Sequence, residues 1–371
     1  MPAQYLHIVS FNIPYPADYG GVIDIFYKIN ALSQAGIRVI LHCFQYGRQH
    51  SKELEDLCFE VHYYHRKHGL KYLLQKEPYI VVTRSPNSMP KNLLGDSFPV
   101  LFEGIHTTAF LGLCKEARKQ VLVRAHNIEH SYYAGLARST KSLAQKLFFR
   151  WEATKLQKYE KTIGQADHIL SIARHEADYF KEKYGNCIFL PAFHRFEEVS
   201  SLPGSGNYIL YHGNLSVSDN SEVILALARS VLHRIPHEVV VAGKNPSMDF
   251  RKRIARFPNI RLVADPGDQE LEKLIVQAHI NLLFTPQATG IKLKLLHSLF
   301  AGRHCLVNPQ MVEGSGLEML CRVAGSEKEL ESQIHGLMQQ GFAESELEKR
   351  KKALKDYSNR ASAEKILRLL T

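Results

Sequence analysis

One stretch of the chain combines a glycine turn, a helix start and two lysines, residue types that together bind anions. It begins at Phe284 and reads FTPQATGIKLKLLHSLFAG. An apolar segment ends at Pro286, a turn at Gly290 opens a predicted helix, and Lys292 and Lys294 fall in its first turns. A helix N-terminus offers unpaired N–H donors and a partial positive charge, to which two ammonium groups add full charges. The pattern predicts an anion site suited to a diphosphate.

A second polar cluster follows the strand predicted at residues 120–125. Arg124, His126, Asn127 and Glu129 lie at or just beyond its carboxyl end. Ligands of parallel sheets bind beyond that end of the strands, so these side chains are candidates for ligand contact. The alternative interpretation is that His126 only caps the helix that follows.

The same cluster matches one pattern of zinc ligands. His126, Glu129 and His130 spell H-x-x-E-H, which holds zinc when both histidines share one helical face. Because His126 follows a strand almost at once, we expect it to precede the helix. We therefore predict no metal site.

Two adjacent glycines, Gly20 and Gly21, lie between the first predicted strand and the amphipathic run 22–34. At such a turn, glycine lets backbone N–H groups approach a ligand closely. A tight structural turn explains the pair equally well. The dinucleotide fingerprint G-x-G-x-x-G is absent from the chain, which argues against an NAD or FAD enzyme.

The elements that must position these residues alternate between short apolar runs and longer amphipathic stretches, which is typical of parallel sheets wrapped by helices. The fold class is α/β. A segment rich in Pro, Gly and Ser at 190–207 predicts a boundary, giving domains at 1–195 and 196–350 and a charged terminal helix at 351–371 that packs back on the first domain. Strands are predicted at 4–11, 37–44, 58–63, 79–83, 99–103, 120–125 and 167–172, and then at 208–212, 237–242, 259–264, 280–284, 304–307 and 321–324.

Composition bounds the class of protein. Of 371 residues, 45% are hydrophobic and 23% are charged, as in ordinary globular proteins. The six cysteines form no C-x-x-C pair, and no apolar run approaches the ~20 residues of a membrane helix. Without an export signal at the N-terminus, we expect a cytoplasmic protein.

The net charge of +10 is concentrated in the first half, where residues 1–195 hold 25 Lys and Arg against 17 Asp and Glu. Such a surplus fits an anionic partner or a merely solvated face. Within it, the predicted helix 138–161 carries Leu143, Leu147, Phe148 and Trp151 at helical spacing among lysines and arginines. We favour burial of this stripe in its own domain over peripheral contact with an anionic membrane, the alternative. Nucleic-acid binding is not expected, because an aromatic and basic motif is missing.

Taken together, the motifs and their order resemble the retaining glycosyltransferases of family 4, in the branch with a Thr-Gly-Ile-Lys-x-Lys donor motif. The resemblance rests on the Gly20-Gly21 loop, the segment from Arg124 to Glu129, the turn Tyr211-His212-Gly213-Asn214-Leu215, the run from Val240 to Lys244, and the stretch from Thr289 to Gly302. It implies a GT-B fold of two Rossmann-like domains facing a cleft.

The resemblance also implies roles. His126, Lys292 and Lys294 would be catalytic, the lysines stabilising the leaving phosphate and His126 bordering the transferred sugar. Acceptor contacts would come from Gly20, Gly21, Arg124, Asn127 and Glu129. Donor contacts would come from Gly213, Asn214, Lys244, Thr289, Gly290, Ile291 and His297, with residues 263–267 near the base.

Two positions depart from the family pattern. His297 stands where a glutamate usually accepts hydrogen bonds from the ribose hydroxyls, and a neutral histidine has one acceptor nitrogen. The turn at Gly213 carries neither the Arg nor the Lys that many relatives place there. Lys244, Lys292 or Lys294 would then have to neutralise the diphosphate.

The function implied is transfer of a hexose-type sugar, with retention, from a UDP- or GDP-sugar to a glycan or lipid-linked acceptor in surface polysaccharide biosynthesis. No cofactor and no obligatory metal are expected, because the mechanism relies on positioning and electrostatic stabilisation. Two alternatives remain open: a GT-B sugar-nucleotide epimerase, and a non-catalytic GT-B subunit that binds a nucleotide sugar.

Overall fold

The structure is a computed structural model that describes residues 4–140, 142–286 and 293–370. The chain divides into two compact units, Met1–Arg195 with Tyr357–Thr371, and Phe196–Asp356. The return to the first unit begins at Tyr357 rather than at residue 351. Helix α15 (Glu344–Leu354) stays in the second unit because the buried Arg350 guanidinium donates to the carbonyls of Gly302 and Arg303, at 2.6 and 2.7 Å.

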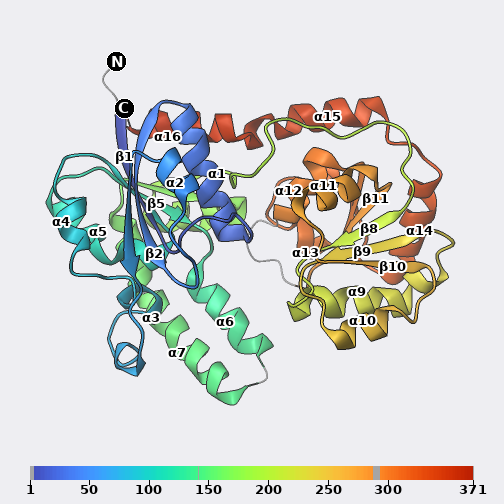
Figure 1. Ribbon diagram of the computed structural model, residues 1–371, viewed down its shortest axis with the longest axis horizontal. Helices are drawn as coiled ribbons and strands as arrows, with labels where there is room; N and C mark the ends of the chain where they lie inside the picture. The colour runs from blue at the N-terminus through green and yellow to red at the C-terminus, as the bar shows by residue number, and fades with distance from the viewer. Residues whose placement is uncertain (1–3, 141, 287–292, 371) are drawn as a thin grey trace. The chain divides into compact units, whose positions relative to one another are not determined.

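The described residues of the first unit form a seven-stranded parallel sheet in the order β3-β2-β1-β4-β5-β6-β7 (Figure 1). Strand order reverses beside β1, which pairs with both β2 and β4. In open parallel sheets this is where ligands bind, at the carboxyl ends of the strands. The strands are β1 (Gln4–Ser10), β2 (Ile37–Gln45), β3 (Glu60–His65), β4 (Val100–Glu103), β5 (Val121–Ala125), β6 (His168–Ser171) and β7 (Cys187–Phe189).

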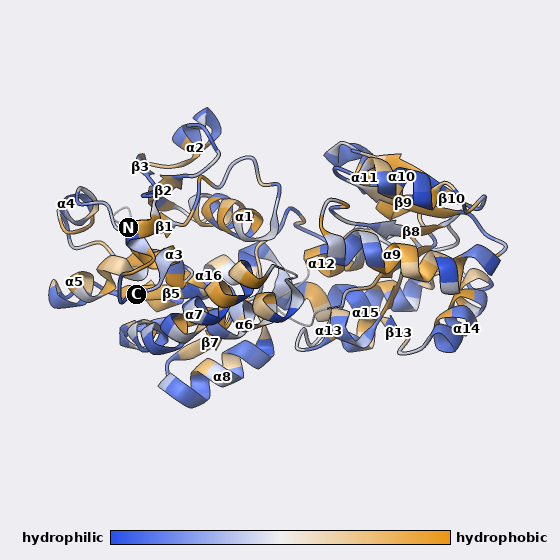
Figure 2. Cartoon of the chain, turned by 90° about the horizontal axis from the view of Figure 1, so that it is seen from below, coloured by the Kyte–Doolittle hydropathy of each residue, from blue (hydrophilic) through white to orange (hydrophobic). Residues whose placement is uncertain are grey.

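The sheet separates two apolar cores. Because side chains alternate along a strand, Val121 and Val123 of β5 enter one core while Leu122 enters the other. Figure 2 shows the same division, with hydrophobic strands and largely hydrophilic outer helices such as α8. One core holds Ile25, Ile29 and Ile366, so helices α1 and α16 cover the same face. The terminal helix thus packs on the domain that contains the first strand.

The helices of the first unit connect these strands. They are α1 (Gly20–Gln34), α2 (Lys52–Leu57), α3 (Tyr79–Val82), α4 (Met89–Leu93), α5 (Leu111–Glu116), α6 (Glu129–Ser139), α7 (Leu143–Tyr159), α8 (Arg174–Tyr184) and α16 (Asn359–Leu370), with 3-10 turns at Leu70–Tyr72, Ile105–Phe110, Glu160–Gln165 and Lys355–Tyr357. Among these residues no helix is both long and apolar enough to cross a membrane.

Two predictions about this unit were wrong. Residues 79–83 were expected as a strand, but Tyr79–Val82 form helix α3, whose first N–H group is bound by the buried carboxylate of Glu152 at 2.7 Å. This tertiary contact overrides the strand preference of the β-branched run. The apolar stripe on α7 was expected in the core, yet Leu143 and Leu147 are 78% and 67% exposed.

In the second unit, the described residues form a six-stranded parallel sheet in the order β10-β9-β8-β11-β12-β13. Its order reverses beside β8, which pairs with β9 and β11. The strands are β8 (Ile209–His212), β9 (Val239–Gly243), β10 (Ile260–Ala264), β11 (Ile280–Leu283), β12 (His304–Val307) and β13 (Arg322–Val323). Its helices are α9 (Ser218–Ser230), α10 (Met248–Ile254), α11 (Asp268–Gln277), α12 (Leu293–Ala301), α13 (Pro309–Val312), α14 (Glu327–Met338) and α15, with 3-10 turns at Leu232–Arg234 and Glu318–Leu320.

Candidate functional site

In the first unit, the predicted polar residues gather where the strand order reverses. Gly20 and Gly21 are the first two residues of α1 rather than part of an open loop. A Cβ atom on Gly21 would lie 2.6 Å from Cζ of Phe11, so this glycine lets the helix start pack directly on the Phe11 ring. The helix start has no side-chain cap and no acidic residue in its first turn, which leaves its dipole uncompensated by side chains.

A buried set of charges lies beneath this helix start. Lys28 Nζ is 2.9 Å from Asp24 on the same helix and 2.6 Å from Glu103 at the end of β4. None of the three side chains is more than 1% exposed. Burial opposes ionisation of Asp24, but the ion pairs with Arg124 and Lys28 hold its pKa well below the usual value. Burial likewise opposes ionisation of Glu103, and Lys28 lowers the pKa of that carboxyl.

Arg124 completes the charge balance from strand β5. Its Nη2 and Nε atoms donate to the Asp24 carboxylate at 2.8 and 3.1 Å, and its remaining contacts are the carbonyls of Leu190 and Pro191. The side chain has no exposed surface. This placement argues against the predicted contact between Arg124 and an acceptor, and gives Arg124 a supporting role instead.

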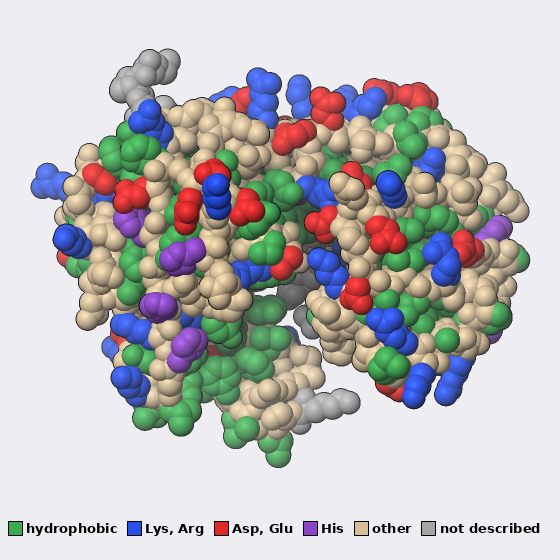
Figure 3. Space-filling model, viewed as in Figure 1, with side chains coloured by type: hydrophobic (Ala, Val, Ile, Leu, Met, Phe, Trp, Pro, Cys, Tyr) green, Lys and Arg blue, Asp and Glu red, His purple; other side chains and the backbone are tan. Residues whose placement is uncertain are grey.

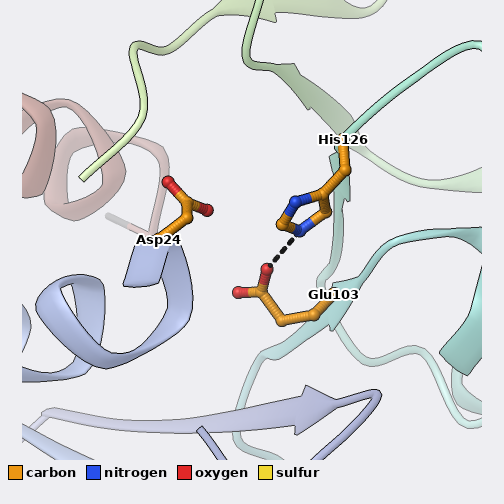
Figure 4. Close-up of side chains that lie close together, drawn as sticks. All are labelled: Asp24, Glu103 and His126. Carbon is orange, nitrogen blue, oxygen red and sulfur yellow. Dashed lines mark hydrogen bonds and ion pairs between the residues drawn. The ribbon is translucent and has the colours of Figure 1, made fainter. Parts of the chain in front are cut away.

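His126 lies just beyond β5, at the edge of the buried charges. Its Nε2 atom is 3.0 Å from Oε2 of Glu103 (Figure 4). Its ring packs edge-on against Phe11. An ionised carboxylate can only accept, so we assign the proton to Nε2, which leaves Nδ1 as an acceptor in the neutral ring. The side chain is 9% exposed, unlike its fully buried partner. His126 is therefore held in one orientation by a fixed charge.

Metal binding by this cluster is countered by its own cations. Ligand atoms of Asp24, Glu103 and His126, the side chains drawn in Figure 4, lie within 4.8 Å of one another. Lys28 and Arg124 already neutralise both carboxylates, so a divalent cation would have to displace them. The two histidines of the H-x-x-E-H pattern have separate carboxylate partners, since His130 is 2.9 Å from Glu160 whereas His126 is 3.0 Å from Glu103.

Asn127 and Glu129 join this site at the start of α6. Glu129 is 6% exposed, and its Oε1 atom accepts a hydrogen bond of 3.3 Å from the Asn127 amide. Burial raises the pKa of Glu129 to about 7, against the smaller opposing effects of that hydrogen bond and of Arg84. Sequence reasoning selected Glu129 for contact with a ligand. The structure adds that its charge changes near neutral pH.

In the second unit, two predicted donor residues lie at a junction built from glycines. A Cβ atom on Gly243, the last residue of β9, would overlap the carbonyl oxygen of Gly213 after β8. A Cβ atom on Gly213 would lie 3.2 Å from the side chain of Asn220. Asn220 in turn donates to the carbonyl of Asn214 at 2.9 Å. Because these two residues are glycines, no side chain of theirs hinders the approach of another group to the backbone at this junction.

Lys294 reaches this junction from the first turn of α12. Its ammonium group is 3.4 Å from Oδ1 of Asn220 and 3.3 Å from the carbonyl of Phe284, and it lies 5.7 Å from the centre of the Tyr211 ring. A cation is thus anchored between the ends of β8 and β11, where the strand order reverses. Sequence reasoning selected Lys294 but missed Asn220, whose only signal was its place at the start of the helix after Gly213.

His297 occupies the next turn of α12 within an aromatic group. Its ring lies 4.5 Å from Phe196 and 6.0 Å from His212. Burial, aided by Lys294, lowers the pKa of His212 to about 3, so His212 is neutral, and its Nε2 is 3.3 Å from Oγ of Ser298. His212 was not among the predicted donor contacts.

The remaining donor predictions fall at the edge of this region. Lys244 is exposed directly after β9, and its carbonyl accepts from Leu215 at 2.9 Å. In the segment 263–267, Asp265 adopts φ 54° and accepts from the backbone N–H of Asn245 at 2.6 Å. Four other predicted residues lie outside the described part of the chain: Thr289, Gly290, Ile291 and Lys292.

Comparisons with known proteins agree with this architecture. No protein-family model matches the chain. An uncharacterized 44.6 kDa protein from the cps region of Klebsiella pneumoniae is 27% identical over 313 residues, which cover 79% of each chain.

Solved structures resemble the chain over almost its whole length. A mutant of S. aureus TarM, in complex with fondaparinux, alpha-GlcNAc-glycerol and UDP, aligns with a TM-score of 0.68 at 8% identity, over 99% of this chain and 100% of TarM. Anabaena HepE in complex with UDP and glucose aligns with a TM-score of 0.65 at 10% identity, over 99% of both chains. A glycosyltransferase from Rickettsia africae gives 0.62 at 12% identity, over 100% and 98%. The two Rossmann-like units therefore have the GT-B fold.

The buried charges predict a strong effect of Arg124→Met. Removing the guanidinium leaves the Asp24 carboxylate buried beside a single cation, and breaking such a pair costs about 3–5 kcal/mol of unfolding free energy. Denaturant unfolding measures this loss. The double variant Asp24→Asn with Arg124→Met should recover part of it, because no unpaired carboxylate remains. A single variant as stable as the parent would contradict the assigned charge balance.

The raised pKa of Glu129 predicts a pH dependence. A carboxyl whose pKa is about 7 when folded and near 4.5 when unfolded favours the folded state below pH 4.5, and this contribution is lost as pH rises through 7. The difference corresponds to at most roughly 3 kcal/mol. Glu129→Gln should flatten the change in unfolding free energy between pH 5 and about 8. An unchanged pH profile would show that Glu129 titrates normally.

Proposed function

We propose that this chain is a retaining glycosyltransferase similar to family 4 enzymes. It would transfer a hexose-type sugar from a UDP- or GDP-sugar to a glycan or lipid-linked acceptor in surface polysaccharide biosynthesis. The nucleotide sugar would bind to the second unit, and the acceptor and transferred sugar would contact the first.

The observation that carries this proposal is the junction of Gly213, Gly243, Asn220 and Lys294. Two glycines open the backbone at the carboxyl ends of β8 and β9, and a lysine is anchored beside them by Asn220. A diphosphate needs backbone that it can approach closely and a matching positive charge, and the glycine junction with Lys294 would offer both. The site lies at the reversal of strand order, where sheets of this kind bind nucleotides.

The comparisons support the proposal from two directions. TarM and HepE, which share the fold, carry UDP in their crystal structures. The Klebsiella relative is encoded in a cps region, which supports a role in surface polysaccharide. The six cysteines of this chain are all free, five of them buried, which supports a reducing compartment such as the cytoplasm.

The proposed step breaks the bond between the anomeric carbon and the phosphate oxygen and forms a bond from that carbon to the acceptor oxygen. The acceptor proton passes to the departing phosphate on the same face of the sugar, which gives retention. Negative charge grows on the phosphate as the bond breaks, so Lys294 would stabilise the transition state more than the bound donor. We expect no obligatory metal, because Lys294 would supply positive charge beside the leaving phosphate.

His126 would act on the sugar side. With Nε2 bound to Glu103, the Nδ1 atom can accept a hydrogen bond from a sugar hydroxyl. The buried pair of Lys28 and Glu103 fixes the ring, so the acceptor atom is already oriented before the ligand arrives. Its role would be positioning rather than proton abstraction.

Lys294→Met tests the donor site. Hydrogen bonds to charged groups contribute about 1.5–3 kcal/mol, so UDP or GDP should bind roughly tenfold to a hundredfold more weakly. Calorimetry or thermal shift against UDP, GDP and their sugar conjugates measures this loss. Lys273→Met, on the exposed face of α11, is the matched control that should bind normally. Equal nucleotide affinity in both variants would remove Lys294 from the donor site.

His126→Ala tests the sugar side. Nucleotide affinity should stay within about twofold, while turnover with a sugar donor falls by roughly tenfold or more, the loss of one aligned hydrogen bond. Product analysis separates the outcomes further. Conversion of the donor without an acceptor would indicate an epimerase, and donor binding without turnover in the parent protein would indicate a non-catalytic subunit.

A further inference from the structure

Five large hydrophobic side chains are exposed on one part of the first unit. Leu143, Leu147 and Trp151 of α7 are 78%, 67% and 43% exposed, and Leu70 and Leu74, in and after the 3-10 turn that follows β3, are 80% and 82% exposed. Figure 3 shows hydrophobic side chains gathered at the end of this unit formed by α7 and its neighbours. We call these five residues, with the cations described below, the basic apolar surface.

The exposed row on α7 is separate from the side that packs into the protein. Leu143, Leu147 and Trp151 follow at intervals of four, so they share one face of the helix. The opposite side holds Glu152, which binds the start of α3, and Phe148, which contacts Tyr79 edge-on. The outward row therefore contributes nothing to the described core.

A hydrogen bond joins the two segments that carry this surface. Lys155 Nζ donates to the carbonyl of Leu73 at 2.6 Å and lies 3.9 Å from the centre of the Trp151 ring. This contact joins α7 to the turn that carries Leu70 and Leu74. The exposed leucines of both segments thus belong to one surface rather than to two independent loops.

The charges around these residues are mainly positive, with the exposed Glu77 directly after the turn as an exception. Lys146 and Arg150 follow three residues after Leu143 and Leu147, on the adjacent row of the helix. Lys71 and Lys76 flank the exposed leucines of the turn. Residues 66–76 contain no Asp or Glu, and residues 138–159 contain only Glu152, which is fully buried.

We propose that the basic apolar surface docks on the headgroup region of an anionic lipid bilayer. Leucine and tryptophan side chains beside lysine and arginine match a bilayer surface, where apolar groups enter the interface and cations meet lipid phosphates. A second copy of the chain fits poorly, because self-pairing would bring these cations together with only the exposed Glu77 beside the two segments to offset them. The inference does not depend on the proposed donor site.

Trp151 is the only tryptophan of the chain, so its fluorescence reports directly on this surface. The full-length protein is mixed with vesicles of phosphatidylcholine, or of equal parts phosphatidylcholine and phosphatidylglycerol. We expect a blue shift of the emission with the anionic vesicles, quenching by brominated lipid, and release at high salt. An emission spectrum unchanged by anionic vesicles would overturn the proposal.

Paired variants separate the apolar and charged contributions. Leu143→Ser with Leu147→Ser should weaken vesicle binding at least about tenfold, the factor that burial of one leucine supplies. Lys146→Gln with Arg150→Gln should weaken it roughly tenfold or more on anionic vesicles. All four positions lie on the outward side of the helix, so the circular dichroism spectrum should not change.

Met319, which is 84% exposed in the second unit, supplies the matched control. Met319→Ser removes an equally exposed apolar side chain and should bind vesicles normally. Equal binding by the parent and both paired variants would overturn the proposal. So would sedimentation showing a dimer that Leu143→Ser with Leu147→Ser converts to a monomer, because the surface would then be an interface between copies.

Discussion

The first unit is organised around a buried carboxylate, Asp24, that requires positively charged and hydrogen-bonding partners. Asp24 is 1% exposed, and an unpaired charge at that depth costs several kcal/mol. It is matched by Lys28, by Arg124 and by the backbone N–H of Phe193, which come from α1, from β5 and from the segment after β7. The helix, the sheet and the segment after β7 are thereby fixed in one arrangement around the Asp24 carboxylate.

This charge balance also positions His126. Lys28 bridges Asp24 and Glu103, Arg124 supplies the second positive charge, and Glu103 uses its other oxygen to hold the His126 ring. Of these side chains, His126 is the one that reaches partial exposure. A buried ion set therefore orients an outward acceptor atom without itself meeting a ligand, which explains how Arg124 can matter to the site while staying in the core.

In the second unit, the candidate site also lies where the strand order reverses, but a different physical constraint shapes it. Space rather than charge is the constraint where β8 and β9 end, since a Cβ atom on Gly243 would overlap the carbonyl oxygen of Gly213 and one on Gly213 would crowd the Asn220 side chain. The turn carries no arginine or lysine of its own, and Asn220 instead links the turn to Lys294 on α12. Lys294, on a helix distant in sequence, can thus supply the positive charge that the turn lacks.

The sequence allowed prediction of most strands, because each buried strand of a parallel sheet is a short apolar run. The prediction of a strand at residues 79–83 was wrong. There the carboxylate of Glu152, 73 residues away in sequence, binds the first N–H group of a helix. The pair Asp24 and Lys28 has the spacing of an ordinary surface ion pair, and its partner Glu103 is 75 residues away. Local patterns therefore selected His126 and Lys294 as candidates but not Glu103 and Asn220, which hold them in place.

Helix α7 shows why the sequence could not settle one further question. Core burial and surface docking were treated as alternatives for a single apolar stripe, but the helix carries two. Leu156 and Glu152 face inward, whereas Leu143, Leu147 and Trp151 face outward. Seventeen residues are enough for an inner side that anchors the helix and an outer row left for another partner. The packing of the helix against its neighbours decides which row is which, and the bond between Glu152 and the backbone N–H of Tyr79 is one of the contacts that fix it.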